Sequence, residues 1–99
     1  MMKFRLTQRA QDDLLSIARY TQRHWGVSQR NQYLLSFDAC FRRIAENPSC
    51  GRVCDDIRLG YRQLPQGSHV VFYHQISDGW IDVVRILHKS QLTSGAQDT

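Results

Sequence analysis

Lysine is scarce in this sequence of 99 residues: it occurs only at Lys3 and Lys89, so arginine supplies most of the 13 basic side chains. The net charge of +4 and the pI near 9.3 would suit a nucleic-acid-binding protein, but acidic pairs at Asp12-Asp13 and Asp55-Asp56 interrupt the scattered basic residues. Guanidinium groups make paired hydrogen bonds to carboxylates and tolerate partial burial better than ammonium groups. An arginine-rich surface of this kind suits acidic protein partners as well as phosphates.

Long apolar runs and an apolar leader are also absent. No stretch approaches the roughly 20 apolar residues that span a bilayer, and the amino terminus, residues 1–5, has no apolar core. The cysteines Cys40, Cys50 and Cys54 do not have the two-residue spacing of a zinc knuckle. We therefore expect a cytoplasmic protein that binds no metal, no cofactor and no membrane.

The length bounds the domain organisation. A chain of 99 residues is long enough for one hydrophobic core and too short for a separate cofactor domain, and no repeat or linker interrupts it. We expect residues 1–99 to form a single domain, with residues 93–99 as a frayed polar tail.

The first half of the chain has the pattern of a short strand followed by two helices. Lys3 to Leu6 alternates polar and apolar residues, which predicts a strand. Thr7 is a candidate N-cap for a helix that Gly26 ends, and Ser28 is a candidate N-cap for a second helix that Asn47-Pro48 ends. Three- and four-residue steps place one set of mainly apolar side chains on a single face of each helix: Ala10, Leu14, Ile17, Ala18, Thr21 and Trp25 in the first, and Tyr33, Phe37, Phe41 and Ile44 in the second.

The second half of the chain has the pattern of a β-meander. After a loop at 49–60, three runs rich in β-branched and aromatic residues follow at 61–65, 69–76 and 80–88. The short connections between them contain glycine and are typical of antiparallel neighbours. The order β-α-α-β-β-β predicts an α+β fold in which a helical hairpin packs on one face of a small antiparallel sheet and leaves the other face partly open.

Several motifs, in their order and spacing, resemble one known family over nearly the whole chain. The motifs are Asp13-Leu14, Tyr20, Trp25-Gly26, Tyr33, Ala45-Glu46-Asn47-Pro48, Gly51, Asp55-Asp56-Ile57-Arg58, Gly60-Tyr61-Arg62, His69-Val70-Val71-Phe72-Tyr73 and Arg85-Ile86-Leu87-His88. Together they resemble the ParE-type toxins of the RelE/ParE superfamily, whose fold is similar to the one predicted above.

The resemblance implies a bacterial toxin that a small ParD-like antitoxin holds silent in a hetero-oligomer. ParE-type toxins are generally described as poisons of DNA gyrase, so that replication stalls. The related RelE branch instead cuts messenger RNA on the ribosome, and since both branches share one scaffold, the fold does not choose between them. Operator DNA would be bound by the antitoxin, with no direct specific DNA binding by this chain. A third possibility is an inactive binding module that has lost its toxicity.

The residues themselves bear on RNA cleavage, which without a metal needs a base, an acid and cations around the phosphorane. The candidates are Arg62, Arg85 and His88, with Tyr73, His69 and His74 as further acid-base groups. Strand alternation places Arg85 and His88 on opposite faces, and no lysine lies in the strands expected at 61–65, 69–76 and 80–88. The sequence therefore favours a binding protein over an enzyme. It also favours a His88 ring that hydrogen-bonds to the backbone or to a carboxylate over a proton shuttle.

The expected antitoxin contacts combine aromatic and basic side chains. Arg58, Arg62 and Arg85 are candidates to pair with acids of the antitoxin, whose carboxyl-terminal region is expected to wrap this chain. Trp25 and Tyr33 are candidates around the hairpin turn, where core or rim packing is favoured over a base-stacking platform. The carboxyl end departs from the family pattern. Members of the family often have an arginine or an acidic residue soon after the histidine, whereas Lys89-Ser90-Gln91-Leu92 follows His88 here.

Overall fold

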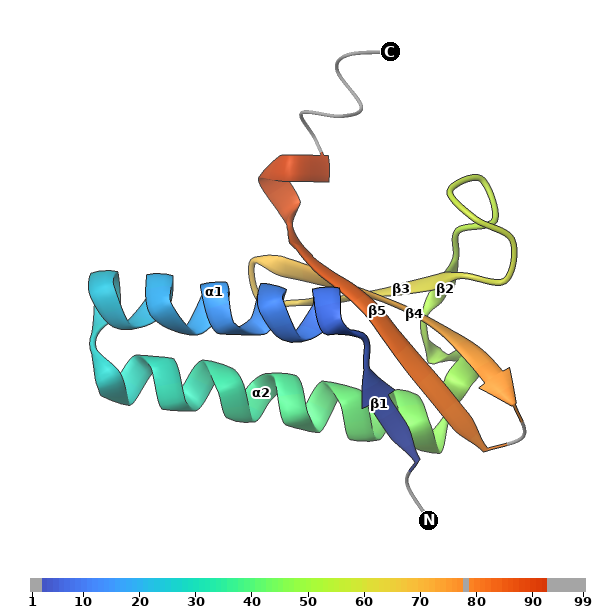
Figure 1. Ribbon diagram of the computed structural model, residues 1–99, viewed down its shortest axis with the longest axis horizontal. Coiled ribbons are helices and arrows are strands. Elements are labelled where there is room, and N and C mark those ends of the chain that lie inside the picture. The colour runs from blue at the N-terminus through green and yellow to red at the C-terminus, as the bar shows by residue number, and fades with distance from the viewer. Residues whose placement is uncertain (1–2, 78, 93–99) are drawn as a thin grey trace.

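Two antiparallel helices cover one face of a five-stranded sheet in the computed structural model, which describes residues 3–77 and 79–92 (Figure 1). The hairpin extends past the edge of the sheet, so its turn overhangs open space (Figure 1). The α+β class and the β-α-α-β-β-β order are confirmed, with one additional strand of two residues in the predicted loop at 49–60. The tail predicted at 93–99 lies outside the described residues.

The helices begin and end close to the predicted residues. Helix α1 spans Gln8–Trp25, and the Thr7 hydroxyl accepts a hydrogen bond from the Ala10 N–H at 3.2 Å, as an N-cap does. Helix α2 spans Val27–Glu46 and ends at Asn47. The prediction that Ser28 caps α2 is wrong, because Gly26 is at once the C-cap of α1 and the N-cap of α2. Its φ of 92° turns the chain from one helix into the next within one residue, a conformation that glycine adopts without a steric penalty.

The sheet is mixed, which corrects the expectation of an antiparallel sheet. The strands are β1 (Phe4–Leu6), β2 (Arg52–Val53), β3 (Arg62–Gln66), β4 (His69–Ser77) and β5 (Trp80–His88), in the order β1-β5-β4-β3-β2. β3, β4 and β5 are antiparallel, but β1 pairs in parallel with β5. Local turn signals predicted only the antiparallel pairs. The direction of β1 depends on the helical hairpin that separates it from the other strands. β2 and the short 3₁₀ helix η1 (Pro48–Cys50) occupy the predicted loop.

Hydrophobic clusters lie on both faces of the sheet. The main core joins the helices to the sheet through Ala10, Ile17, Phe37, Cys40, Phe41, Ile44, Leu64, Val71, Tyr73, Ile81, Val83 and Ile86. On the outer face, Val70, Phe72 and Cys54 are buried beneath Tyr61, Val84, Leu87 and Leu92. The expectation of a partly open outer face therefore holds only for the part beyond Phe72, where β4 becomes exposed.

A buried tyrosine joins η1 to the sheet. The Tyr73 hydroxyl donates a hydrogen bond to the Pro48 carbonyl at 2.7 Å and accepts one from the Gly51 N–H at 2.8 Å. Burial raises the pKa of Tyr73 to about 12, against the opposing effect of the Gly51 N–H. Only 1% of Tyr73 is exposed, so this side chain acts in packing and is poorly placed for the acid-base role considered above.

We expect Gly51→Ala to lower the free energy of unfolding by about 1–3 kcal/mol, as overpacking does. A Cβ at this position would lie 2.5 Å from the Tyr73 hydroxyl and 2.8 Å from the Gln63 carbonyl oxygen. Urea denaturation of both proteins measures the difference, with Ser49→Ala at an exposed neighbour as control. Equal stability of Gly51→Ala and wild type would contradict this account of the packing.

Candidate functional site

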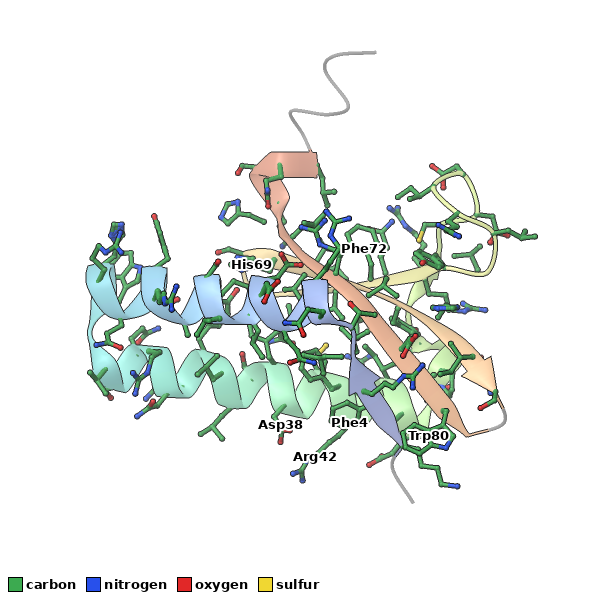
Figure 2. The ribbon with its side chains drawn as sticks, viewed as in Figure 1. Phe4, Asp38, Arg42, His69, Phe72 and Trp80 are labelled. Atoms are coloured by element: carbon green, nitrogen blue, oxygen red, sulfur yellow. The ribbon has the colours of Figure 1, made fainter. Side chains whose placement is uncertain are left out.

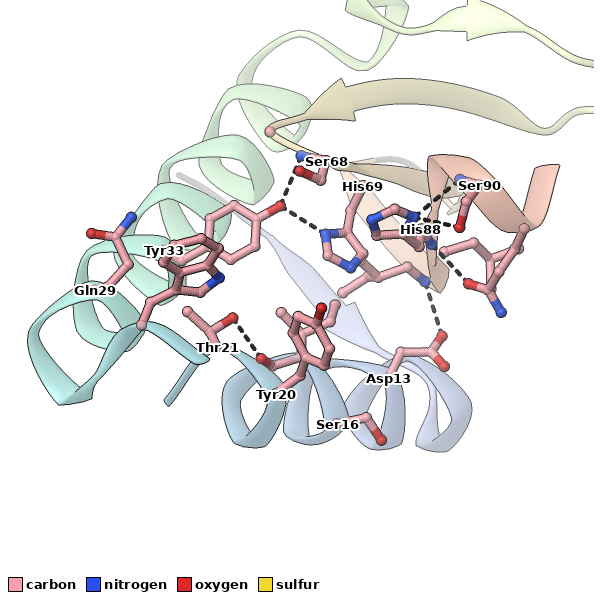
Figure 3. Close-up of a pocket in the computed structure, with 16 residues that line it drawn as sticks. Asp13, Ser16, Tyr20, Thr21, Gln29, Tyr33, Ser68, His69, His88 and Ser90 are labelled. Carbon is pink, nitrogen blue, oxygen red and sulfur yellow. Dashed lines mark hydrogen bonds between the residues drawn. The ribbon is translucent and has the colours of Figure 1, made fainter. Parts of the chain in front are cut away.

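A groove of about 880 Å³ lies where the overhanging hairpin meets the end of the sheet (Figure 3). One wall is the face of α1 that carries Ile17, Tyr20, Thr21 and Trp25, residues that recur at three- and four-residue steps. The opposite wall combines the β3–β4 turn with the end of β5. The residues that line the groove are Asp13, Ser16, Ile17, Tyr20, Thr21, Trp25, Gln29, Tyr33, Gly67, Ser68, His69, Ile86, Leu87, His88, Ser90 and Gln91.

Tyr33 fastens helix α2 to the β3–β4 turn at the base of the groove. Its hydroxyl accepts a hydrogen bond from the Ser68 N–H at 3.0 Å, donates one to the Gln66 carbonyl at 3.2 Å, and lies 2.7 Å from His69 Nδ1. The turn passes so close to the ring that a Cβ at Gly67 would lie 2.7 Å from it. Burial raises the pKa of Tyr33. The side chain is therefore an internal anchor as well as part of the groove.

His69 stands between the aromatic side chains of α2 and His88. Its ring centroid lies 5.6 Å from that of Tyr33, 5.9 Å from that of Phe37 and 5.1 Å from that of His88. Burial, and then the neighbouring His88, lower the pKa of His69 from 6.5 to about 4, while Asp13 acts in the opposite direction. The imidazole is therefore neutral near pH 7.

His88 is the N-cap of a short helical segment at 89–92. Its Nδ1 accepts a hydrogen bond from the Ser90 N–H at 3.0 Å and lies 2.7 Å from Ser90 Oγ. In return, Gln91 Oε1 accepts a hydrogen bond from the His88 N–H at 2.8 Å. This reciprocal pattern is a capping box with histidine in the place of serine or threonine. The predicted bond from the His88 ring to the backbone is present.

Asp13 connects α1 to β5 beside the groove. Its carboxylate accepts hydrogen bonds from Arg85 Nε at 2.7 Å and Arg85 Nη2 at 3.1 Å, and from the Ile86 N–H at 2.9 Å. The hydrogen bond to Asp13 raises the pKa of Arg85. The Arg85 guanidinium is therefore bonded within the chain.

The predicted site residues lie in two separate places. Trp25, Tyr33 and His88 line the groove, and Arg85 bonds to the Asp13 that lines it. Arg62 lies elsewhere and donates from Nη1 to the Gly51 carbonyl at 2.8 Å. Arg58 lies over the Tyr61 ring, with its Cζ 5.8 Å from the ring centroid. The three arginines therefore do not converge on one phosphate.

Sequence reasoning assigned no site role to two residues that shape the groove. Asp13 belongs to an acidic pair and to the Asp13-Leu14 motif, but its partner Arg85 is 72 positions away, so the bond between them could not be expected. Gly67 carried the ordinary signal of a turn, and the sequence offered no sign that Tyr33 would pack against it.

The chemistry of the groove favours binding over phosphate transfer. Its walls combine aromatic rings, aliphatic side chains and two imidazoles, and no lysine or arginine lines it among the residues that the structure describes. Cleavage of RNA needs cations around the phosphorane, and the guanidinium of Arg85 beside the groove is already bonded to Asp13. Within 3–77 and 79–92, no three His, Cys, Asp or Glu side chains gather as a metal site would require, and neither helix has the length and hydropathy to cross a membrane.

Comparison with known proteins identifies close relatives. The family profile described as "ParE toxin of type II toxin-antitoxin system, parDE" matches residues 4–93. Toxin ParE1 of Mycobacterium tuberculosis is 46% identical over 87 residues, which cover 88% of this chain and 89% of the relative. Toxin ParE1 of Caulobacter vibrioides is 39% identical over 90 residues, which cover 91% and 92%. A solved structure titled "Chromosomal ParDE TA system from P. aeruginosa" has a similar fold, with a TM-score of 0.74 at 18% identity, over 89% of this chain and 96% of that one.

We expect the free energy of unfolding to fall as the pH is lowered from about 6.5 toward 4. The pKa of His69 is lowered from 6.5 to about 4 by folding, so in this window the unfolded chain binds more protons than the folded one. Urea denaturation at a series of pH values measures the slope. His69→Asn should flatten it, whereas His24→Asn, at an exposed position of α1, should not. Identical slopes in wild type and His69→Asn would contradict the assignment.

Proposed function

We propose, since this chain belongs to the ParE toxin family of type II toxin-antitoxin systems, that it inhibits DNA gyrase in the cytoplasm and that a ParD-like antitoxin silences it. The family match carries the toxin assignment. The resemblance to ParE-type toxins implies the gyrase target. The antitoxin partner is suggested by the family itself, which is described as the toxin of the parDE toxin-antitoxin system. In this proposal the toxin acts by binding and makes or breaks no covalent bond itself.

We propose the groove as the binding site of the antitoxin. Two large aromatic side chains on its wall are well exposed, Trp25 at 71% and Tyr20 at 59%. Tryptophan and tyrosine are the residues that most often dominate binding energy at protein interfaces. A groove with an apolar floor beside a helix suits an amphipathic segment that inserts apolar side chains at helical spacing. We therefore propose Trp25, with Tyr20 beside it, as the main antitoxin contact in the groove, and the partly buried Tyr33, which also lines the groove, as a further contact.

The arginines have different roles in this proposal. Arg58, on the exposed loop, is the candidate that pairs with an acid of the antitoxin outside the groove. Arg85 and Arg62 already bond to Asp13 and to the Gly51 carbonyl. They could pair with acids of the antitoxin only through guanidinium N–H groups that are not used in these bonds. We therefore expect them to contribute less to the binding energy than Arg58.

RNA cleavage on the ribosome is the alternative function, and one cluster of side chains supports testing it. His69, His88 and the Tyr33 hydroxyl lie together in the groove and could in principle exchange protons. Two observations weigh against it. The nearest candidate cation, Arg85, is bonded to Asp13, and the second, Arg62, bonds to Gly51 away from the groove. Acid-base groups without cations would not stabilise the phosphorane.

We expect Trp25→Ala to weaken binding of the cognate ParD-like antitoxin at least about tenfold, as the loss of a central aromatic anchor does. The antitoxin is the one encoded beside this chain, and isothermal titration calorimetry measures the affinity. Leu35→Ala is the matched control, because Leu35 on α2 is 69% exposed and does not line the groove. Equal affinities for the two variants would rule out the groove as the binding site.

Purified toxin should inhibit supercoiling by purified DNA gyrase and trap cleaved DNA, and added antitoxin should reverse the effect. A parallel translation reaction should continue with its transcripts intact. His88→Ala separates the two functions, because a gyrase inhibitor that uses no proton transfer should keep its inhibition. Ribosome-dependent cleavage of transcripts that His88→Ala abolishes would establish the nuclease alternative instead. Expression that harms no cells in the absence of antitoxin would indicate an inactive module.

A further inference from the structure

A row of polar and aromatic side chains crosses the outer face of the sheet, beyond the cluster around Phe72. Arg5 of β1 is in register with Asp82 of β5, which is in register with His74 of β4. Arg5 Nε lies 2.6 Å from the Asp82 carboxylate, and His74 Nε2 lies 3.9 Å from it. Next along the row, the rings of His74 and Tyr61 stack, with centroids 4.9 Å apart and planes 32° apart.

An exposed aromatic side chain, Trp80, lies beside this row. Trp80 precedes Asp82 by two residues on β5, so strand alternation places both on the outer face, and 41% of Trp80 is exposed. Figure 2 shows Trp80 at the opposite end of the sheet from His69 and therefore from the groove. Lys3 flanks it, because a Cβ at Gly79 would lie 3.7 Å from Lys3 Cδ.

Cations border these aromatic rings on both sides. Lys3 and Arg5 lie on the β1 side, and Arg58 lies over the Tyr61 ring on the loop side. The side chain of Arg5 remains 64% exposed although its Nε bonds to Asp82. Asp82, the carboxylate within the row, is 14% exposed and faces both Arg5 and His74. Asp55, in the loop that carries Arg58, directs its carboxylate to the Gly60 N–H at 2.9 Å.

We propose that this outer face binds single-stranded nucleic acid without sequence preference. Sheets that bind single strands present aromatic rings on neighbouring strands for stacking and surround them with cations for the phosphates. Trp80 would stack on one base. His74 and Arg58 already contact the Tyr61 ring, so the Tyr61–His74 pair would contact a second base at its edge, while Lys3, Arg5 and Arg58 contact phosphates. Paired bases of a duplex present no free face, so the surface selects single strands. Such binding reads no operator sequence and is separate from the antitoxin groove.

Fluorescence anisotropy with labelled oligonucleotides of about 15 nucleotides, within the site size of single-strand binding folds, tests the proposal on the full chain. The probes are oligothymidylate, oligouridylate and a duplex of equal length. We expect at least one single strand to bind more tightly than the duplex, and the preferred strand identifies DNA or RNA as the ligand. With three phosphate contacts, the affinity should fall with the salt concentration to a power of about 2.

Substitution of the two tryptophans provides a matched comparison. Trp80→Ala should lower the affinity for the single strand at least about fivefold, the lower end of what one stacked base contributes. Trp25→Ala removes an even more exposed tryptophan from the groove and should leave the affinity unchanged. Trp80→Phe keeps a stacking ring and should retain most of the binding, which separates stacking from a loss of folding.

Three results would overturn the proposal: no binding of either single strand at about 50 mM salt, where phosphate contacts are strong, equal affinity for the duplex, or equal effects of Trp80→Ala and Trp25→Ala. Displacement of the oligonucleotide by polyglutamate at equal charge concentration would also overturn the proposal, because it would show that the surface binds any polyanion through its positive charge alone. Because the assay contains only this chain and oligonucleotides, its outcome does not depend on whether gyrase is the target.

Discussion

The arrangement of this protein depends on how helix α1 completes the edge of strand β5. β1 is only three residues long and pairs with β5 at 81–83, so residues 84–88 of β5 have β4 on one side and no strand on the other. Thr7 donates from its N–H to the Val83 carbonyl and from its hydroxyl to the Val84 carbonyl, each at 3.0 Å. Asp13 then accepts the Ile86 N–H. Buried or half-buried backbone groups are costly when unpaired, so these bonds place α1 against β5.

The position of α1 determines where the groove can form. Once Asp13 is bonded to β5, the remaining turns of α1 extend past the sheet and carry Tyr20 and Trp25 away from the main core. Tyr33 holds the other helix to the β3–β4 turn in the same way. The groove is therefore bounded by two polar anchors, and apolar packing of the hairpin alone would leave its width unspecified.

The two faces of the sheet have different chemistry because different elements cover them. The helices bury one face in the main core, and the groove at its end is lined by aromatic, aliphatic and polar side chains together with Asp13. On the other face, Cys54 and Leu92 cover only part of the sheet. The uncovered part carries Trp80 and His74 with cations at its borders. The chain thus offers an apolar aromatic groove and a basic aromatic surface at opposite ends of its sheet.

Local patterns predicted the elements well and their relations less well. The Thr7 cap, the end of α1 at Gly26 and the strand at 80–88 depend on neighbouring residues, so the sequence alone determined them. Trp25 and Tyr33 could be named as candidate antitoxin contacts because large aromatic side chains around a hairpin turn are suited to a protein interface. The parallel pairing of β1 and the bond between Asp13 and Arg85 join residues more than 70 positions apart. No local pattern records such pairs, and the same holds for the row that joins Arg5, Asp82, His74 and Tyr61.

The sequence by itself therefore determined the helices, the later strands and the family, because these follow from periodicity and motif order. Only the tertiary structure decided which charges are paired and which aromatic rings remain exposed, because both depend on which distant strand or helix lies beside each residue.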